Sequence, residues 1–345
     1  MPSRAWGPTV KTDRFLAIGP LMMVSLVLAF AFNLQAHAQQ RLKVRLILPS
    51  QATTYQLPYF IPKDTGWFDQ RGLDVEEVFV GGDSTALRTV ISGSGDITIV
   101  GPPAVFHAYS EGAKIKYVGS WQPLVDYQIL SAKAITDLSQ LADKTFASAG
   151  PSDLTAEIPR LVMRKRGINT DNVKFIQVGG HAPRLQALEV GKVQATMVNT
   201  LTSLVGQRHG DVNVLTKVSS EFPKLGYIML TAKAGDLDDP TKRRALEIFL
   251  EGSIYGARQI KQNPERATEV LAKRVPDLPK DLIRSALQEL NAINAWGVDG
   301  GLDPEMVTFT SDAFMKWNMI QKPVTPAEIV DDRLVKAALA KLGPQ

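Results

Sequence analysis

Apolar and polar positions after residue 40 follow two different periods. Leu42–Leu48 alternates apolar and basic residues, and this period of two predicts a strand. Helical spacing follows over 56–66, a second strand over 74–80, a helix over 83–92 and a third strand over 96–100. Such an alternation of strands and helices predicts an α/β fold with a mainly parallel sheet flanked by helices.

The chain contains an internal repeat at an offset of 98 residues. Residues 80–101 align with 178–199 without a gap, and seven of the 22 positions are identical, including Gly81/Gly179, Gly82/Gly180 and Thr98/Thr196. We interpret the repeat as two lobes with similar α/β cores. The alternative is that two strand–Gly–Gly–helix units share only ordinary turn chemistry.

After Thr231 the pattern becomes helical. Helices are predicted over 240–261, 264–274, 280–295, 304–319 and 326–342. Three of them begin with a polar residue followed by proline, which is typical of a capped helix start. These segments are predicted to form a helical layer that packs on an existing lobe.

The N-terminus has the pattern of a secretory signal peptide. Basic residues precede an apolar run over 15–32, and small residues at Ala36 and Ala38 supply a cleavage site. The alternative is a membrane anchor, because the run could just span a bilayer. Gly19 and Pro20 within the run favour a signal peptide that is cleaved after Ala38, and hence a periplasmic protein.

Composition excludes several classes of function. The chain has 39 Lys and Arg against 35 Asp and Glu, and removal of the leader leaves 36 against 34. This small net positive charge gives no indication of nucleic-acid binding. The absence of cysteine excludes disulfides, thiol catalysis, Cys-based zinc sites and a lipidated N-terminus. Nucleotide-binding and hydrolase motifs are missing, and His107, His181 and His209 do not have metal-ligand spacing. No metal and no catalytic residue is predicted.

Candidate binding residues gather at strand-to-helix junctions. Small residues fill the junctions at 81–85, 150–155 and 179–182, where backbone N–H groups at helix starts can hold an anionic or polar ligand atom. The alternative is ordinary capping, in which Asp83, Ser84 or Ser152 only satisfies its own helix.

Two passages are expected to join the lobes as a hinge, at 120–123 and 225–227. They would put Trp121 and Tyr227 beside the cleft, where aromatic faces can stack on a ligand. Packing within the hinge is an equally good account of these two residues.

Several short motifs occur in a characteristic order. They are Gly66-Trp67-Phe68, Arg71-Gly72-Leu73-Asp74, Gly81-Gly82, residues 91–97, residues 137–144, Arg166-Gly167-Ile168 and residues 185–195. In this order they resemble the periplasmic substrate-binding proteins of ABC importers of the nitrate/sulfonate/taurine type, a family similar to thiamine-pyrimidine-precursor-binding proteins. The resemblance covers 42–203.

This resemblance implies a type II, two-lobed binding fold. Residues 39–123 and 229–345 would form the first lobe, with the C-terminal helices on it, and 124–228 the second, after a signal peptide over 1–38. A monomer without a cofactor would capture a small solute and deliver it to a membrane permease with a cytoplasmic ATPase. The ligand-binding residues it implies, together with the two hinge aromatics, are Gln51, Thr53, Tyr55, Asp83, Ser84, Thr85, Pro102, Pro103, Trp121, Ser152, Asp153, Thr155, His181, Asn199 and Tyr227.

Two other functions are alternatives to transport. Enzymes of the thiamine-pyrimidine synthase type share this fold, but they need a cysteine-rich motif that this chain lacks. A periplasmic sensor acting on a membrane partner other than a permease is the remaining alternative.

The class of solute stays open between anionic and neutral or aromatic compounds. A carboxylate at Asp83 would repel a tetrahedral anion if it faced the cleft. Arg88 and Arg184 lie one turn or more inside their predicted helices and are not clearly placed to bind an anion. Tyr55 suits a neutral or aromatic solute as well.

Overall fold

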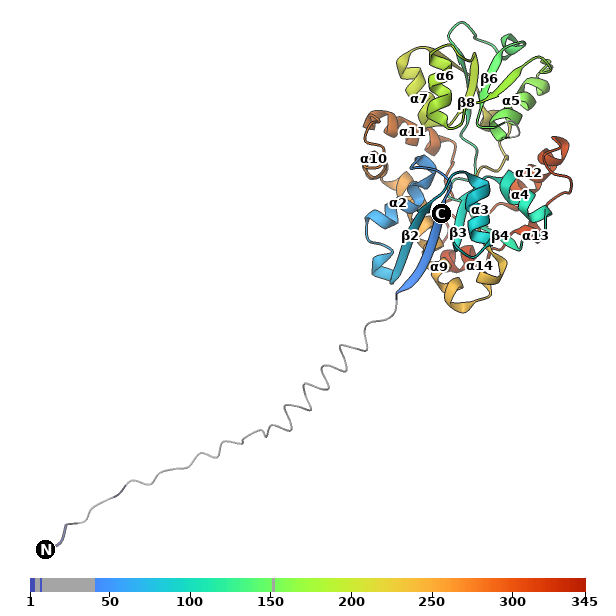
Figure 1. The fold of residues 1–345 in the computed structure, drawn as a ribbon. Coiled ribbons are helices and arrows are strands. Elements are labelled where there is room, and N and C mark those ends of the chain that lie inside the picture. Colours follow the sequence, from blue (N-terminus) through green and yellow to red (C-terminus); the bar gives the residue numbers. More distant parts are fainter. Residues whose placement is uncertain (4–6, 8–40, 151–152) are drawn as a thin grey trace. The chain divides into compact units, whose positions relative to one another are not determined.

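Two five-stranded sheets with the same topology carry the fold of the computed structural model (Figure 1). The first sheet has the order β2-β1-β3-β10-β4 and the second β7-β6-β8-β5-β9. In each sheet one strand, β10 or β5, runs antiparallel to both of its neighbours, while the other pairings are parallel. The strands of the first sheet are β1 (Leu42–Leu48), β2 (Leu73–Phe79), β3 (Ile97–Val100), β4 (Ile115–Gly119) and β10 (Met229–Lys233). Those of the second are β5 (Gln128–Ala132), β6 (Thr145–Ser148), β7 (Lys174–Gln177), β8 (Ala195–Val198) and β9 (Val212–Lys217).

The structure describes residues 1–3, 7, 41–150 and 153–345, of which Leu42–Gln345 form one compact unit. The predicted signal peptide with its cleavage site after Ala38 and the predicted ligand residue Ser152 lie outside the described residues. Among the helices of the described residues, none combines the length and the apolar character needed to cross a bilayer.

Helices cover both faces of each sheet (Figure 1). We call each sheet with the helices packed on it a lobe. On the first sheet, α3 (Asp83–Ile91) and α4 (Pro102–Ser110) pack together, and α9 (Pro240–Gln262) packs against β1 and β2 with α2 (Leu57–Asp64) and α14 (Arg333–Leu342) beside it. On the second sheet, α6 (His181–Glu189) and α7 (Thr200–His209) pack together, and α5 (Leu154–Lys165) packs against β6 and β8. The two-lobed α/β prediction is confirmed.

The sequence repeat is a structural repeat. Adding 98 to both ends of α3 and of β3 gives both ends of α6 and of β8. The shared threonines explain part of the identity, because the hydroxyl of Thr98 donates to the Ile47 carbonyl at 2.8 Å and that of Thr196 to the Ala147 carbonyl at 3.0 Å. In each lobe this buried bond fastens a central strand to its parallel neighbour.

The C-terminal helices form as predicted, with one division. α10 (Pro264–Ala272), α11 (Lys280–Ala292) and α12 (Pro304–Lys316) fall within the predicted segments, but 326–342 divides into α13 (Pro326–Ile329) and α14. The division has a local cause, because Val330 adopts an extended conformation and pairs with Tyr117 of β4. Short turns complete the chain: η1 (Thr54–Gln56), η2 (Asp69–Arg71), η3 (Leu138–Leu141), η4 (Ala234–Leu237) and α8 (Val218–Glu221).

Two segments of the chain cross from one sheet to the other and lie side by side. Leu124 forms an isolated antiparallel bridge with Gly226, and the N–H of Tyr227 donates to the Pro123 carbonyl at 2.9 Å. The hydroxyl of Ser120 also donates to the Ile228 carbonyl at 2.7 Å. The crossings are therefore hydrogen-bonded to each other rather than independent linkers.

Helix α11 adds a contact between the lobes that the sequence did not predict. It packs against α7 of the second sheet, whereas α10 packs against α2 of the first. The Lys217 ammonium lies 2.5 Å from the Glu289 carboxylate, and Arg208 pairs with Asp281. The C-terminal helical layer thus reaches both lobes.

An aromatic core joins α2 to α9. The Tyr59 ring stacks on Trp121 at 5.9 Å and tilts against Phe249 at 6.0 Å. The helix backbones approach most closely at Gly256, where a side-chain Cβ would overlap the Pro58 carbonyl and lie 2.9 Å from Cδ of Pro62. Glycine at 256 is what allows α9 to pack this close to α2.

Substitution of this glycine tests the packing. We expect Gly256→Ala to lower the free energy of unfolding by about 1–3 kcal/mol, because the added methyl group forces the helices apart. The control Gly235→Ala adds the same group where no atom lies within 4 Å and should change stability by less than about 0.5 kcal/mol. Chemical denaturation of both variants gives the comparison, and equal stabilities would contradict the close-packing account.

Candidate functional site

The same hydrogen bond occurs at the carboxyl end of the central strands in both sheets. In the first lobe the N–H of Gly101, just after β3, donates to Oδ2 of Asp83, the first residue of α3, at 2.8 Å. In the second, the N–H of Asn199, just after β8, donates to Nδ1 of His181, the first residue of α6, at 3.2 Å. Both acceptors and both donors are related by the 98-residue repeat. Each lobe therefore holds one polar side chain at the carboxyl end of its central strands.

The structure resolves the role of Asp83. Its side chain does not cap α3, because the N-cap residue is Gly82 and no side-chain capping bond forms there. Burial raises the pKa of Asp83 to about 6, the Gly101 N–H opposes that rise, and the charge of Asp153 in the second lobe adds to it. The carboxyl group is thus half-buried, forms no ion pair with any of the described residues, and lies within the electrostatic reach of the opposite lobe.

The hydrogen bonds of His181 define its tautomer. Nδ1 accepts from the Asn199 N–H and from Nη2 of Arg184, at 3.2 and 3.1 Å, so the ring proton must lie on Nε2. Burial, with the Arg184 charge beside it, lowers the pKa of His181 to about 3. The imidazole is therefore a neutral ring that offers an Nε2–H donor.

Arg184 is a buried cation that organises this end of the second lobe. It is 1% exposed and donates to the Met197 carbonyl at 2.9 Å, to the Gly179 carbonyl and to His181. None of its hydrogen-bond partners in the described part of the chain is a carboxylate. Its guanidinium positions His181 and gives the second lobe a positive interior, which differs from the carboxylate of the first lobe.

Three tyrosine rings connect the lobes. Tyr227 in the second crossing makes edge contacts with Tyr55 of η1 at 6.2 Å and with Tyr127 at 5.2 Å. Tyr127, which precedes β5, also contacts the His181 ring at 5.5 Å. Burial raises the pKa of all three phenols, so each is protonated at neutral pH and can donate a hydrogen bond.

One hydrogen bond directly links two predicted ligand residues, Thr53 and Asn199, which lie in different lobes. Nδ2 of Asn199 donates to Oγ1 of Thr53 at 3.3 Å, while Oδ1 of Asn199 caps α7 by accepting from the Thr202 N–H at 2.9 Å. We call the residues that meet here the interlobe cluster. Its members are Thr53, Tyr55, Asp83, Tyr127, His181, Asn199 and Tyr227.

Some predicted site residues have structural roles instead. Trp121 is 1% exposed, and its indole N–H donates to Ser253 at 3.0 Å within the aromatic core of the first lobe. This corrects the prediction that Trp121 lies beside the cleft. Thr155 is buried and joined to Asp153, whose carboxylate caps α5. Asp153 is exposed, and its charge still reaches Asp83 and Tyr127.

The remaining predicted residues stay predictions. Within the described ranges their side chains form no hydrogen bond to the interlobe cluster, although they occupy the neighbouring junctions: Gln51, Ser84, Thr85, Pro102 and Pro103. Pro102 starts α4 at the position where its missing N–H costs nothing.

Sequence reasoning missed Tyr127 and Asp126. Asp126 is 4% exposed, and its Oδ2 accepts from the Thr200 N–H at 3.2 Å. Burial raises the pKa of Asp126 to about 6. Their position between the first crossing and β5 is the signal that could have identified them.

The raised pKa of Asp83 leads to a prediction about how the free energy of unfolding depends on pH. Its pKa is raised from 3.8 to about 6 on folding, so the unfolded chain loses its proton first and stability falls as pH rises through that window. Asp83→Asn keeps an acceptor for Gly101 and removes the charge. We expect the variant to match the parent near pH 4 and to exceed it by about 1–2 kcal/mol at pH 7, after a discount for partial exposure.

Denaturant titrations across this pH range measure the difference. Asp277→Asn removes the same charge from an exposed loop and should show no such trend. A parent that gains stability over Asp83→Asn as pH rises would contradict the assignment.

Comparison with known proteins agrees with this architecture. The family model described as NMT1/THI5 like matches residues 53–267. YtlA of Bacillus subtilis, whose name describes it as a binding protein, is 21% identical over 83% of this chain and 87% of its own. The periplasmic aliphatic sulphonate binding protein SsuA from Escherichia coli superposes with a TM-score of 0.66 at 17% identity, over 84% of this chain and 92% of its own.

The periplasmic nitrate-binding protein NrtA from Synechocystis PCC 6803 superposes with a TM-score of 0.68 at 14% identity, over 88% of this chain and 90% of its own. At such identities the structural likeness concerns the fold, which is that of periplasmic binding proteins. Since the family model spans more than half of the chain, the protein belongs to the NMT1/THI5-like family.

Proposed function

We propose that this protein is the periplasmic solute-binding component of an ABC importer. It captures a small organic or anionic solute between two hinged lobes and delivers it to a membrane permease with a cytoplasmic ATPase. The observation that carries the proposal is the interlobe cluster, in which polar side chains from the matched ends of both sheets meet across one hydrogen bond, Asn199 to Thr53. A ligand bound there would touch both lobes at once.

The proposed closing motion uses the paired crossings. Because Leu124 and Gly226 are bridged, the lobes 39–123 with 229–345 and 124–228 would rotate about one short, hydrogen-bonded segment. A ligand favours the closed arrangement only to the extent that it binds that arrangement more tightly. Contacts to Asp83 on one side and His181 on the other supply such a difference.

The chemistry of the cluster favours an organic solute with a planar body. Tyr55, Tyr127 and Tyr227 provide ring faces and edges together with hydroxyl donors, and His181 adds a neutral N–H. The family neighbours include sulphonate-binding and nitrate-binding proteins, which supports solute capture. The carboxyl group of Asp83 would repel an anionic group, so an anionic group of the solute would lie on the side of the second lobe.

Binding rather than catalysis is proposed. The chain has no cysteine, and the groups that meet at the site are neutral donors and one carboxyl group without an activated nucleophile. Transport in the periplasm also requires the signal peptide proposed for residues 1–38. No cofactor is part of this proposal.

A thermal-shift screen tests solute capture. The panel is methanesulfonate, nitrate, benzoate, cytosine and glycine. A solute that binds only the folded state stabilises it by about 2.7 kcal/mol at a hundredfold excess over its Kd. We expect one class to raise the melting temperature in proportion to the logarithm of its concentration, whereas no shift with any of the five would argue against capture of these classes.

Substitution of Asn199 tests the site. Asn199→Ser keeps a hydroxyl to cap α7 but is too short to reach Thr53, so we expect affinity for a stabilising solute to fall about tenfold with little change in stability. Asn263→Ser makes the same change at the cap of α10, where Oδ1 accepts from the Arg266 N–H at 3.2 Å. Titration calorimetry on both variants decides the matter, and an unchanged affinity in Asn199→Ser would remove this residue from the site.

A further inference from the structure

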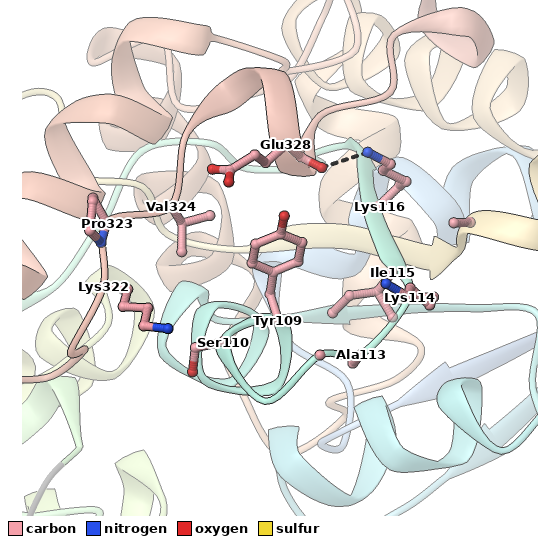
Figure 2. Close-up of a pocket in the computed structure, with 12 residues that line it drawn as sticks. Tyr109, Ser110, Ala113, Lys114, Ile115, Lys116, Lys322, Pro323, Val324 and Glu328 are labelled. Carbon is pink, nitrogen blue, oxygen red and sulfur yellow. Dashed lines mark hydrogen bonds between the residues drawn. The ribbon is translucent and has the colours of Figure 1, made fainter.

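A cavity lies on the first lobe, apart from the interlobe cluster. It has a volume of about 340 Å³ and is lined by the end of α4, the segment 112–116 that leads into β4, and residues 322–328 before and within α13 (Figure 2). None of the residues of the interlobe cluster lines it. Its size falls in the range of small-molecule sites, about 300–1,000 Å³.

Three lysines line this cavity against a single acidic residue. They are Lys114, Lys116 and Lys322, and the acid is Glu328. The ammonium of Lys116 donates to the backbone carbonyl of Glu328 at 2.5 Å, and the Glu328 carboxylate accepts from the N–H and hydroxyl of Thr325 at 2.9 and 2.6 Å. The Glu328 carboxylate is therefore already engaged in capping α13.

Two of the lysines have no such partner among the described residues. In the described part of the chain, the ammonium groups of Lys114 and Lys322 form no ion pair and no side-chain hydrogen bond, and both residues are exposed at the rim. Figure 2 shows the Lys322 side chain extending toward the Tyr109 side of the cavity. The lysines that line the cavity thus outnumber its one carboxylate among the described residues, which leaves an excess of positive charge.

The end of α4 does not cancel this charge. Three carbonyls of its last turn are occupied, since His107, Tyr109 and Ala108 accept from the N–H groups of Glu111, Gly112 and Ala113. The carboxylate of Glu111 lies 3.5 Å from the His107 ring and does not line the cavity. A negatively charged group would therefore meet the lysines and not the Glu111 carboxylate.

Part of the wall between the lysines is apolar. The Tyr109 ring stands at the centre of the cavity, with Ile115, Pro323 and Val324 around it (Figure 2). The Tyr109 hydroxyl has no hydrogen-bond partner among the described residues, and burial with the nearby Glu328 charge raises its pKa, so it remains a donor at neutral pH. Charge at the rim and an aromatic wall inside suit a ligand that has both features.

We propose that this cavity is a second binding site, which takes a small organic anion with a planar apolar body. An inorganic anion would leave the Tyr109, Ile115 and Val324 surfaces without a partner, and a neutral apolar compound would cover the lysine charges without pairing them. The anionic group pairs with Lys114 and Lys322 while the body packs on Tyr109. The site is independent of the interlobe cluster and stands whether or not that cluster binds solute.

Titration with naphthalene-2-sulfonate tests the proposal. The probe has one negative charge on an aromatic body, and 2-naphthol is its neutral match. We expect saturable binding of the sulfonate that weakens as salt is added, and about tenfold weaker binding by the double variant Lys114→Gln with Lys322→Gln. The control is Lys133→Gln with Lys192→Gln, which removes two exposed charges from the second lobe and should bind as the parent does.

Two further measurements separate this cavity from the interlobe cluster. Asn199→Ser should leave unchanged the portion of sulfonate binding that the lysine double variant weakens, and Tyr109→Ala should lower that portion although the lysines remain. Circular dichroism establishes that each variant is folded. The proposal is overturned if the parent does not bind the probe, if both lysine double variants bind alike, if 2-naphthol binds equally well, or if Asn199→Ser alone abolishes binding.

Discussion

The bond between a helix start and a strand exit is the constraint on which the site depends. In each lobe the first residue of a helix accepts the N–H that follows the next strand, with Asp83 bound to Gly101 and His181 bound to Asn199. The bond holds a polar side chain at the sheet edge instead of releasing it to solvent or to its own helix. Without it neither the carboxyl group nor the imidazole would be fixed at the carboxyl end of its sheet.

Duplicated geometry carries different chemistry in the two lobes. The acceptor in the first lobe is an acid without a cation, whereas in the second it is a neutral ring held by the buried guanidinium of Arg184. Positions related by the repeat therefore carry a carboxyl group in one lobe and a neutral N–H donor in the other. Under the proposed function, a solute between the lobes would meet a different polar group on each side.

Local pattern predicted the strands, the helices and the repeat, since these depend on periodicity and on glycine and proline at turns. It failed where long-range packing decides. Trp121 follows a strand at the predicted crossing, but the aromatic rings of α2 and α9 draw it into the core, and nothing near it in the sequence indicates that. Asp83 was undecided between cap and ligand because its partner, Gly101, lies 18 residues away. Tyr127 was missed because only the fold brings it to His181.

Helix α11 has a mechanical consequence for any motion between the lobes. It is held to the second sheet through Glu289 and Asp281, while α10 is held to the first through its packing on α2. If the lobes separate, the loop from Lys273 to Pro279 connects a helix held to one lobe with a helix held to the other. The length to which this loop can extend then limits how far the lobes can move apart. Pro276 and Pro279 stiffen that connection. The range of opening would then be governed by a short surface loop remote from the interlobe cluster, and lengthening that loop would widen the range without changing any residue of the cluster.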